Sequence, residues 1–177
     1  MIKLTGKVAI ITGSSRGFGA KMAEVINECG GQSVVTYLKG DQSEKENAHE
    51  LAKKIKSELV LELDVRSRDS ILKVFSKTAK HFGKIDILIN NAGINMDNLS
   101  LRMKDDEWKK VIDVNLGSTF LLCKHAVKKM LKNKYGRIVN ITSVVGHTGN
   151  LGQANYSASK AGIIGMSKSL AIEYARK

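Results

Sequence analysis

Short apolar runs alternate with longer amphipathic segments along the chain, and this alternation most constrains the fold. Runs rich in Val and Ile predict five buried strands, at residues 7–12, 33–38, 59–65, 85–90 and 137–143. Helical periodicity predicts helices over residues 17–29, 41–57, 68–82, 104–132 and 155–175, with a break in the fourth near Gly117. Strands and helices that alternate in this way form a parallel sheet with right-handed crossovers. We therefore expect one α/β domain spanning residues 1–177, a doubly wound sheet of strand order 3-2-1-4-5 with ligands at the carboxyl ends of its strands.

Composition narrows the class further. The chain has 177 residues, 42% of them hydrophobic, and contains no proline. This apolar content excludes a disordered chain, and no apolar run approaches the length of a transmembrane helix. Cys29 and Cys123 are far apart and the four histidines are scattered, so we expect neither a disulfide framework nor a metal site. The apolar run at the N-terminus is too short for a signal peptide, which favours the cytoplasm, or an organelle matrix for a mature form.

The positive charge is concentrated in the last third of the chain. Of the formal net charge of +12, residues 114–177 supply 10 basic residues against one acidic residue, Glu173. Such a region attracts acidic partners, which include nucleic acids, acidic proteins and phosphorylated small molecules. Aromatic residues that would stack on bases are scarce there, so a nucleic-acid platform is disfavoured. A lysine-rich surface without a partner is the simplest alternative.

A glycine-rich loop joins the first predicted strand to the first predicted helix. Residues 12–19 read Thr-Gly-Ser-Ser-Arg-Gly-Phe-Gly, with a Gly-x-x-x-Gly-x-Gly spacing. Glycines here permit a tight turn and a close approach to phosphate, and the helix begins with free N–H groups that bind a pyrophosphate. The position inside a β-α-β unit predicts a Rossmann-type dinucleotide site formed by the whole loop. Its candidate cofactor-binding residues are Gly13, Ser14, Ser15, Arg16, Gly17, Phe18 and Gly19.

The end of the second strand indicates which dinucleotide is bound. An acidic residue there would hydrogen-bond the ribose 2′-hydroxyl of NAD, but the strand ends in Tyr37-Leu38-Lys39-Gly40. Arg16 and Lys39 would instead neutralise a 2′-phosphate, so the sequence favours NADP(H). Further cofactor contacts are expected from the ends of the third and fourth strands, at Asp64, Val65, Asn91, Ala92 and Gly93.

Four polar residues form a candidate catalytic group. Tyr156 and Lys160 lie four residues apart on one predicted helix and therefore share a face. A nearby ammonium favours the ionised form of a phenol, which suits it to donate a proton at neutral pH to the oxygen of a carbonyl that is being reduced. Ser143, at the end of the fifth strand, would hydrogen-bond that oxygen as charge develops. Asn115 would hold a bend in its helix and bind water, while Tyr156 and Lys160 would also contact the nicotinamide ribose.

These motifs together resemble the short-chain dehydrogenase/reductase family over the whole chain. They are the loop at 12–19, Asp64-Val65, the Asn-Asn-Ala-Gly at 90–93, Asn115, Ser143 and the Tyr-Ser-Ala-Ser-Lys at 156–160. The resemblance implies that Asn115, Ser143, Tyr156 and Lys160 act as a catalytic tetrad, with a water at Asn115 that relays protons through Lys160 and the ribose to Tyr156.

Residues 97–116 and 149–175 resemble one subgroup in particular, the reductases of 3-oxoacyl thioesters on acyl carrier protein. This resemblance implies NADPH as reductant, a role in fatty acid synthesis and a homotetramer. It also implies an acidic carrier as partner for the basic region, with Lys128, Lys129, Lys134, Arg176 and Lys177 as candidate contacts.

The resemblance also implies a departure. Members of the family continue past the last helix into further strands, a Pro-Gly turn and a substrate-covering lid, which holds many of their prolines. We therefore expect a C-terminally truncated chain whose fifth strand forms an open edge. Two alternatives stay open: a reductase of the same family that acts on another ketone or alcohol, and a product that binds nucleotide without turnover.

Overall fold

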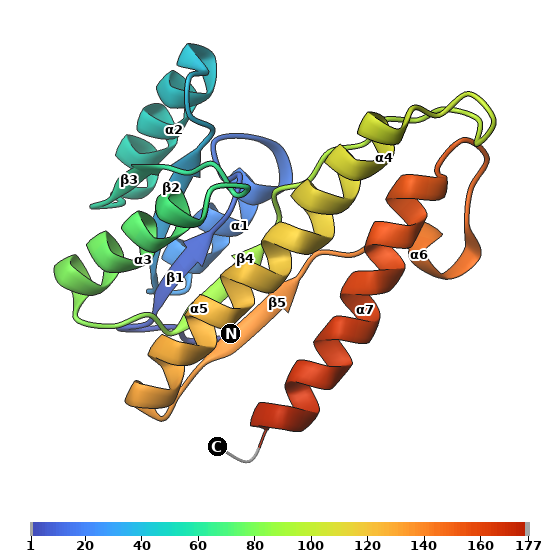
Figure 1. Ribbon diagram of the computed structural model, residues 1–177. Helices are drawn as coiled ribbons and strands as arrows, with labels where there is room; N and C mark the ends of the chain where they lie inside the picture. The colour runs from blue at the N-terminus through green and yellow to red at the C-terminus, as the bar shows by residue number, and fades with distance from the viewer. Residues whose placement is uncertain (1, 176–177) are drawn as a thin grey trace.

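A computed structural model describes residues 2–175 and contains the predicted parallel sheet. The strands are β1 (Val8–Ile11), β2 (Gln32–Tyr37), β3 (Val60–Glu62), β4 (Ile87–Asn90) and β5 (Arg137–Asn140). All four pairings are parallel and the order is β3-β2-β1-β4-β5, which confirms the expected doubly wound fold (Figure 1). The order reverses between β1 and β4, so the loops that follow these two strands lie beside each other, as a ligand site at this point requires.

Helices connect the strands and cover both faces of the sheet. They are α1 (Gly17–Glu28), α2 (Gln42–Ile55), α3 (Arg68–Phe82), α4 (Asp105–Ile112), α5 (Ser118–Asn133), α6 (Val145–Thr148) and α7 (Ala154–Tyr174), with a π-helical segment η1 (Asp113–Gly117) between α4 and α5. The irregularity expected near Gly117 is therefore present as a π-helix inside the long fourth helix. The short helix α6 was not expected from the sequence.

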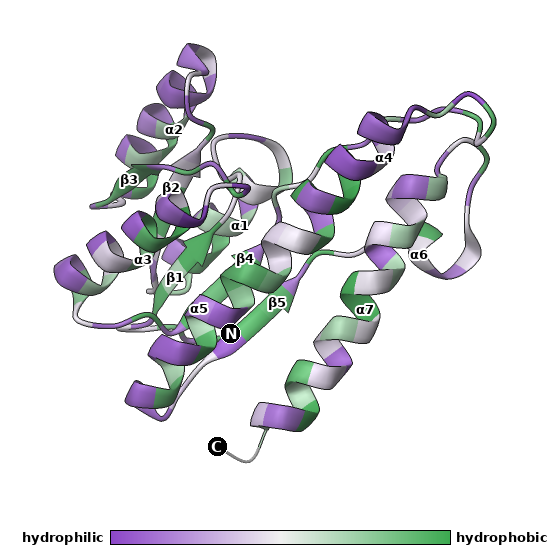
Figure 2. Cartoon of the chain, viewed as in Figure 1, coloured by the Kyte–Doolittle hydropathy of each residue, from purple (hydrophilic) through white to green (hydrophobic). Residues whose placement is uncertain are grey.

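Alternate residues of β1 face the two halves of the core. Val8 and Ile10 pack with α3 and α5, whereas Ala9 and Ile11 pack with α1 and α2. This alternation explains why the central strands are apolar throughout, since both of their faces are buried. Figure 2 shows hydrophobic strands at the centre and hydrophilic outer faces on α2 and α3.

Strand β5 forms one edge of the sheet among residues 2–175. It pairs with β4 on one side, and Val139 is 45% exposed. Helix α7 packs through its N-terminal part against α4, η1 and α6, and its C-terminal part diverges from α5 (Figure 1). The expected open edge at the fifth strand is thus a feature of the described residues.

Candidate active site

The glycine loop has the geometry that a bound pyrophosphate requires. Gly13 and Gly17 have φ values of +64° and +58°, a region that favours glycine. A Cβ on Gly19 would overlap the carbonyl oxygen of Gly13 and lie 2.7 Å from Nδ2 of Asn91. Helix α1 begins at Gly17, so the N–H groups of its first turn have no acceptor within the helix. The loop therefore fits a dinucleotide phosphate at the start of α1.

Two hydroxyl groups of the loop already have partners. The Ser14 hydroxyl donates to the carbonyl of Ile11 at 3.0 Å and accepts from the backbone N–H of Thr36 at 2.8 Å. It therefore ties β1 to β2, and the Ser14 N–H is likewise engaged, because it donates to the carbonyl of Thr36 at 3.1 Å. A contact of Ser14 with the cofactor stays a prediction. The Ser15 hydroxyl donates to Oε2 of Glu44 at 2.6 Å. Phe18, in contrast, is 78% exposed at the start of α1.

The two cations expected to bind a 2′-phosphate are both paired with carboxylates. Arg16 Nε lies 2.9 Å from Oε1 of Glu44, and Lys39 Nζ lies 3.9 Å from Oε1 of Glu62. Lys39 and most of the Arg16 side chain are exposed beside the end of β2. The selection of NADP(H) by Arg16 and Lys39 stays a prediction, and the sequence did not indicate that acidic partners accompany them.

The residues after β3 and β4 line the same edge of the sheet. The Asp64 carboxylate is held by Arg66, whose Nη2 lies 2.9 Å away, and this hydrogen bond lowers the pKa of Asp64. Val65 is buried in the core, so its backbone is what it offers a nucleotide. Asn91 Nδ2 donates to the carbonyls of Thr12 and Gly13 at 3.0 and 3.1 Å.

The segment after β4 also meets the candidate catalytic residues. The N–H groups of Asn91 and Ala92 both donate to the Thr12 hydroxyl, which fixes this segment against the glycine loop. A Cβ on Gly93 would lie 3.2 Å from Oδ1 of Asn115 and 3.8 Å from Nζ of Lys160. At Gly93, the segment expected to contact the cofactor therefore comes close to the candidate catalytic residues.

Asn115 lies within η1 and is almost fully buried, with 1% of its surface exposed. Its Oδ1 accepts from the N–H of Ile94 at 2.8 Å, and its Nδ2 donates to the carbonyl of Ile94 at 2.9 Å and to the Ser159 hydroxyl at 3.1 Å. The side chain thus joins the π-helical segment, the loop after β4 and helix α7. The predicted local irregularity at Asn115 is present, and π-helical turns of this kind are frequent at functional sites.

Tyr156 and Lys160 lie on α7 with Lys160 Nζ 5.5 Å from the centre of the Tyr156 ring. Lys160 is 4% exposed, and burial lowers the pKa of its ammonium group. The ammonium donates to the carbonyl of Ile141, just after β5, at 2.8 Å. The lysine is therefore fixed between α7 and the end of the sheet, beside the tyrosine ring.

Ser143 follows β5 by three residues, because the strand ends at Asn140 and not at residue 143 as expected. It is half-buried, and its carbonyl accepts from the N–H of Gly146 in α6. A Cβ on Gly146 would lie 3.0 Å from the backbone N of Ala161. The helix that follows Ser143 therefore packs closely on α7, which brings the segment carrying Ser143 to the helix carrying Tyr156 and Lys160.

One supporting residue was missed by the sequence reasoning. Asn155 is fully buried, and its Nδ2 donates to the carbonyl of Met96 at 2.9 Å while its Oδ1 accepts from the N–H of Tyr156. It fixes the start of α7 against the loop after β4, and so helps to place Tyr156. An asparagine directly before the Tyr-x-x-x-Lys pattern, at the first turn of a predicted helix, was the available signal.

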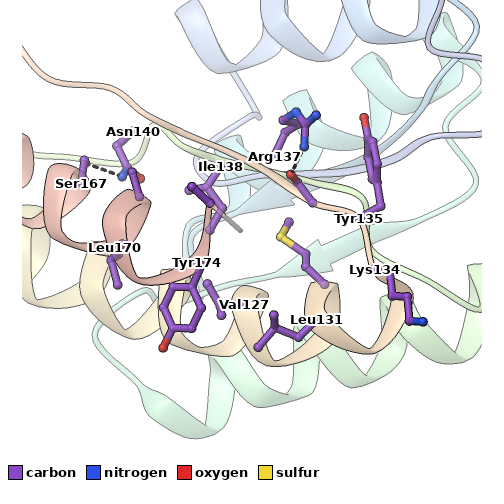
Figure 3. A pocket seen from close by; sticks show the side chains of 14 residues that line it. Val127, Leu131, Lys134, Tyr135, Arg137, Ile138, Asn140, Ser167, Leu170 and Tyr174 are labelled. Carbon is purple, nitrogen blue, oxygen red and sulfur yellow. Dashed lines mark hydrogen bonds between the residues drawn. The ribbon is translucent and has the colours of Figure 1, made fainter. Parts of the chain in front are cut away.

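A cavity in the described residues lies away from the candidate catalytic residues. It has a volume of about 460 Å³ and lies between α5, β5 and α7, with Val127, Leu131, Ile138, Leu170 and Tyr174 among its walls (Figure 3). Asn140 at its side donates to the Ser167 hydroxyl at 2.8 Å. The groove follows from the divergence of α7 from α5 and contains none of the predicted site residues.

The fold and the site together define the class. A sequence model for the short chain dehydrogenase family matches residues 7–177 of this chain. The chain therefore belongs to the short-chain dehydrogenase family, as its motifs predicted. Membership implies an oxidoreductase with a nicotinamide cofactor, which agrees with the glycine loop and with the polar groups at the ends of the strands.

Several proteins that are similar to this chain share one enzyme name. The chain is 48% identical to a 3-oxoacyl-acyl-carrier-protein reductase of Aquifex aeolicus, in an alignment of 98% of this chain and 70% of the relative. It is 44% identical to the protein of the same name from Rickettsia conorii, over 100% of this chain and 70% of the relative. The Salmonella typhimurium protein of that name is 46% identical, over 97% and 69% of the two chains.

Among residues 2–175, no group of three or more His, Cys, Asp or Glu side chains is placed to hold a metal ion. None of their helices is long and apolar enough to cross a membrane.

Proposed function

We propose that this chain carries the cofactor-binding and catalytic residues for NADPH-dependent reduction of a 3-oxoacyl thioester on acyl carrier protein, which yields the 3-hydroxyacyl thioester in fatty acid synthesis. The observation that carries the proposal is the buried Lys160 ammonium, fixed 5.5 Å from the ring of Tyr156. The names of the relatives support the substrate class. In this proposal residues 1–177 act as one domain that both binds the cofactor and carries the catalytic residues.

The proposed chemistry assigns each side chain a task. A bound NADPH would supply the hydride for the 3-oxo carbon. Tyr156 donates the proton to the substrate oxygen, while the Ser143 hydroxyl hydrogen-bonds that oxygen as charge develops on it. The Lys160 ammonium, which lies beside that ring, restores the proton to Tyr156. Asn115 holds η1 in place. A water bound at Asn115 would supply the proton that Lys160 passes on.

The cofactor contacts follow from the loops already described. The first-turn N–H groups of α1 would bind the pyrophosphate, and Arg16 and Lys39 would meet the 2′-phosphate. The residues at 64–65 and 91–93 would line the adenosine, and Tyr156 and Lys160 the nicotinamide ribose. Every one of these residues lies at the carboxyl edge of the sheet, or on the helix that meets it.

The basic surface suits an acidic carrier. Lys128 and Lys134 are exposed on and just after α5, and Lys129 is half-buried between them. The other two candidates, Arg176 and Lys177, lie outside the described residues. The same proposal includes a homotetramer and a cytoplasmic or organelle-matrix location, which the unpaired thiols of Cys29 and Cys123 favour.

The test measures NADPH oxidation with acetoacetyl thioesters of acyl carrier protein and of coenzyme A. Tyr156→Phe is expected to lower kcat by about 10²–10⁴-fold, the usual contribution of a general acid, with a much smaller loss of NADPH affinity from the ribose contact. Tyr135→Phe is the matched control, because Tyr135 precedes β5 and lies away from the site. Its ring packs against Lys7, whose Nζ lies 3.4 Å from the ring centre. Unchanged turnover in Tyr156→Phe would contradict the assigned proton donor. NADPH binding by the unsubstituted chain without turnover of either thioester would contradict the proposed reaction.

A further inference from the structure

The carboxylate of Glu44 binds the side chain of Arg16, one of the two cations expected to contact a 2′-phosphate. Its Oε1 lies 2.9 Å from Arg16 Nε, and its Oε2 accepts from the Ser15 hydroxyl at 2.6 Å. Both oxygens are thus bound to consecutive residues of the loop. The Glu44 side chain is 13% exposed, whereas that of Arg16 is 76% exposed.

The position of Glu44 is fixed by its own helix. Its backbone N–H donates to Oδ1 of Asp41, the N-cap of α2, at 3.0 Å. The cap therefore anchors the first turn of α2 beside the loop, and the carboxylate needs no rearrangement of the chain to reach Arg16. The acid is thus fixed by its helix, whereas the arginine side chain is largely exposed to solvent.

We propose that Glu44 sets the cofactor preference of this site, because its carboxylate competes with the adenosine 2′-phosphate for Arg16. The inference rests on the proposed function for the presence of a dinucleotide, and goes beyond it in naming the residue that opposes the phosphate. When NADP(H) binds, Arg16 must either break its ion pair with Glu44 or bind both the carboxylate and the 2′-phosphate. NAD(H) has a 2′-hydroxyl and makes no such demand.

Two physical effects act in the same direction. The carboxylate occupies the guanidinium, and it repels a phosphate that approaches within a few ångströms. Lys39, the second expected cation, has its own acidic neighbour in Glu62, at 3.9 Å. A prediction made from Arg16 and Lys39 without their acidic partners therefore gives the site too strong a preference for NADP(H).

The experiment titrates NADPH and NADH against the protein and follows cofactor fluorescence, so it requires no turnover. Glu44→Gln is expected to tighten NADPH binding about tenfold relative to NADH, since it removes one charge a few ångströms from the phosphate. Glu46→Gln is the matched control. It removes the same charge from the same helix, but Glu46 accepts from Gln42 at 2.8 Å and does not contact the loop.

A double-mutant cycle with Arg16→Ala tests the route of the effect. If Glu44 acts by holding Arg16, the gain from Glu44→Gln shrinks when Arg16 is absent. A ratio of the two affinities that stays within twofold in Glu44→Gln, or that moves equally in Glu46→Gln, would overturn the inference. An equal loss of both cofactors would also overturn it, since Glu44 would then only support the loop. Failure of the thioester reaction while the affinity ratio moves would count against the proposed function alone.

Discussion

Removal of the Asn115 side chain tests whether the π-helical segment is held by that residue. In Asn115→Ala, the N–H and the carbonyl of Ile94 both lose their partners, at 2.8 and 2.9 Å, and the Ser159 hydroxyl loses its donor. The Ser159 hydroxyl keeps its bond to the carbonyl of Tyr156 at 2.7 Å, so its loss is small.

The expected cost follows from the two backbone groups. A buried polar group left without a partner costs about 1–3 kcal/mol, and the Ile94 groups are only partly buried, which permits some rescue by water. We expect the free energy of unfolding to fall by about 2–4 kcal/mol, a large share of the roughly 5–15 kcal/mol typical of a domain. Urea unfolding followed by circular dichroism measures this change.

A matched substitution separates the buried amide from asparagine in general. Asn150 Nδ2 donates to Oε1 of Gln153 at 3.1 Å on an exposed loop, so Asn150→Ala is expected to change the free energy by less than about 0.5 kcal/mol. A loss below about 1 kcal/mol in Asn115→Ala would refute the reasoning, because it would mean that water fully replaces both hydrogen bonds to Ile94.

Three further predictions concern the packing of α6, the buried thiol and the sheet edge. Gly146→Ala is expected to lower kcat more than it lowers NADPH affinity, because the added Cβ would lie 3.0 Å from the Lys160 carbonyl carbon and shift the catalytic helix; steady-state kinetics and cofactor titration separate the two. Burial raises the pKa of Cys123 from 9.0 to about 11, so the unfolded thiol ionises first, and stability is expected to fall as pH rises between these values; Cys123→Ala, followed by urea unfolding at pH 8 and 10.5, should lack this fall. Val139→Lys is expected to reduce self-association in sedimentation velocity without a loss of stability, because Val139 is 45% exposed on β5, which pairs on one side only among residues 2–175; unchanged association would contradict an edge-mediated contact.

The sheet could be predicted because its signals are local. Each central strand is a short apolar run bounded by polar segments, and the glycine loop follows the first of them directly. The order of the strands then follows from the rules for parallel crossovers. The positions of Asn115, Tyr156 and Lys160 near one edge follow from the same order.

The unexpected features depend on contacts between distant residues. Helix α6 has four residues and owes its position to the close approach of Gly146 to α7, which no local pattern encodes. The π-helical form of η1 accompanies hydrogen bonds from Asn115 to Ile94, 21 residues away. Arg16 and Glu44 are separated along the chain by the whole of α1, by β2 and by the start of α2. Spacing along the sequence can suggest such residues but cannot pair them.

The two ends of the proposed cofactor site hold their positive charges in different ways. Arg16 is exposed and its charge is balanced by the Glu44 carboxylate, so an anionic ligand must compete for it. Lys160 is buried, and its ammonium donates to the neutral carbonyl of Ile141. Burial lowers the pKa of Lys160, so the unfolded chain binds more protons just below the ordinary value of 10.5, and this group contributes stability that rises with pH there. The fold thus retains at Lys160 a charge that costs stability near neutral pH, beside the tyrosine ring that the proposed reaction uses.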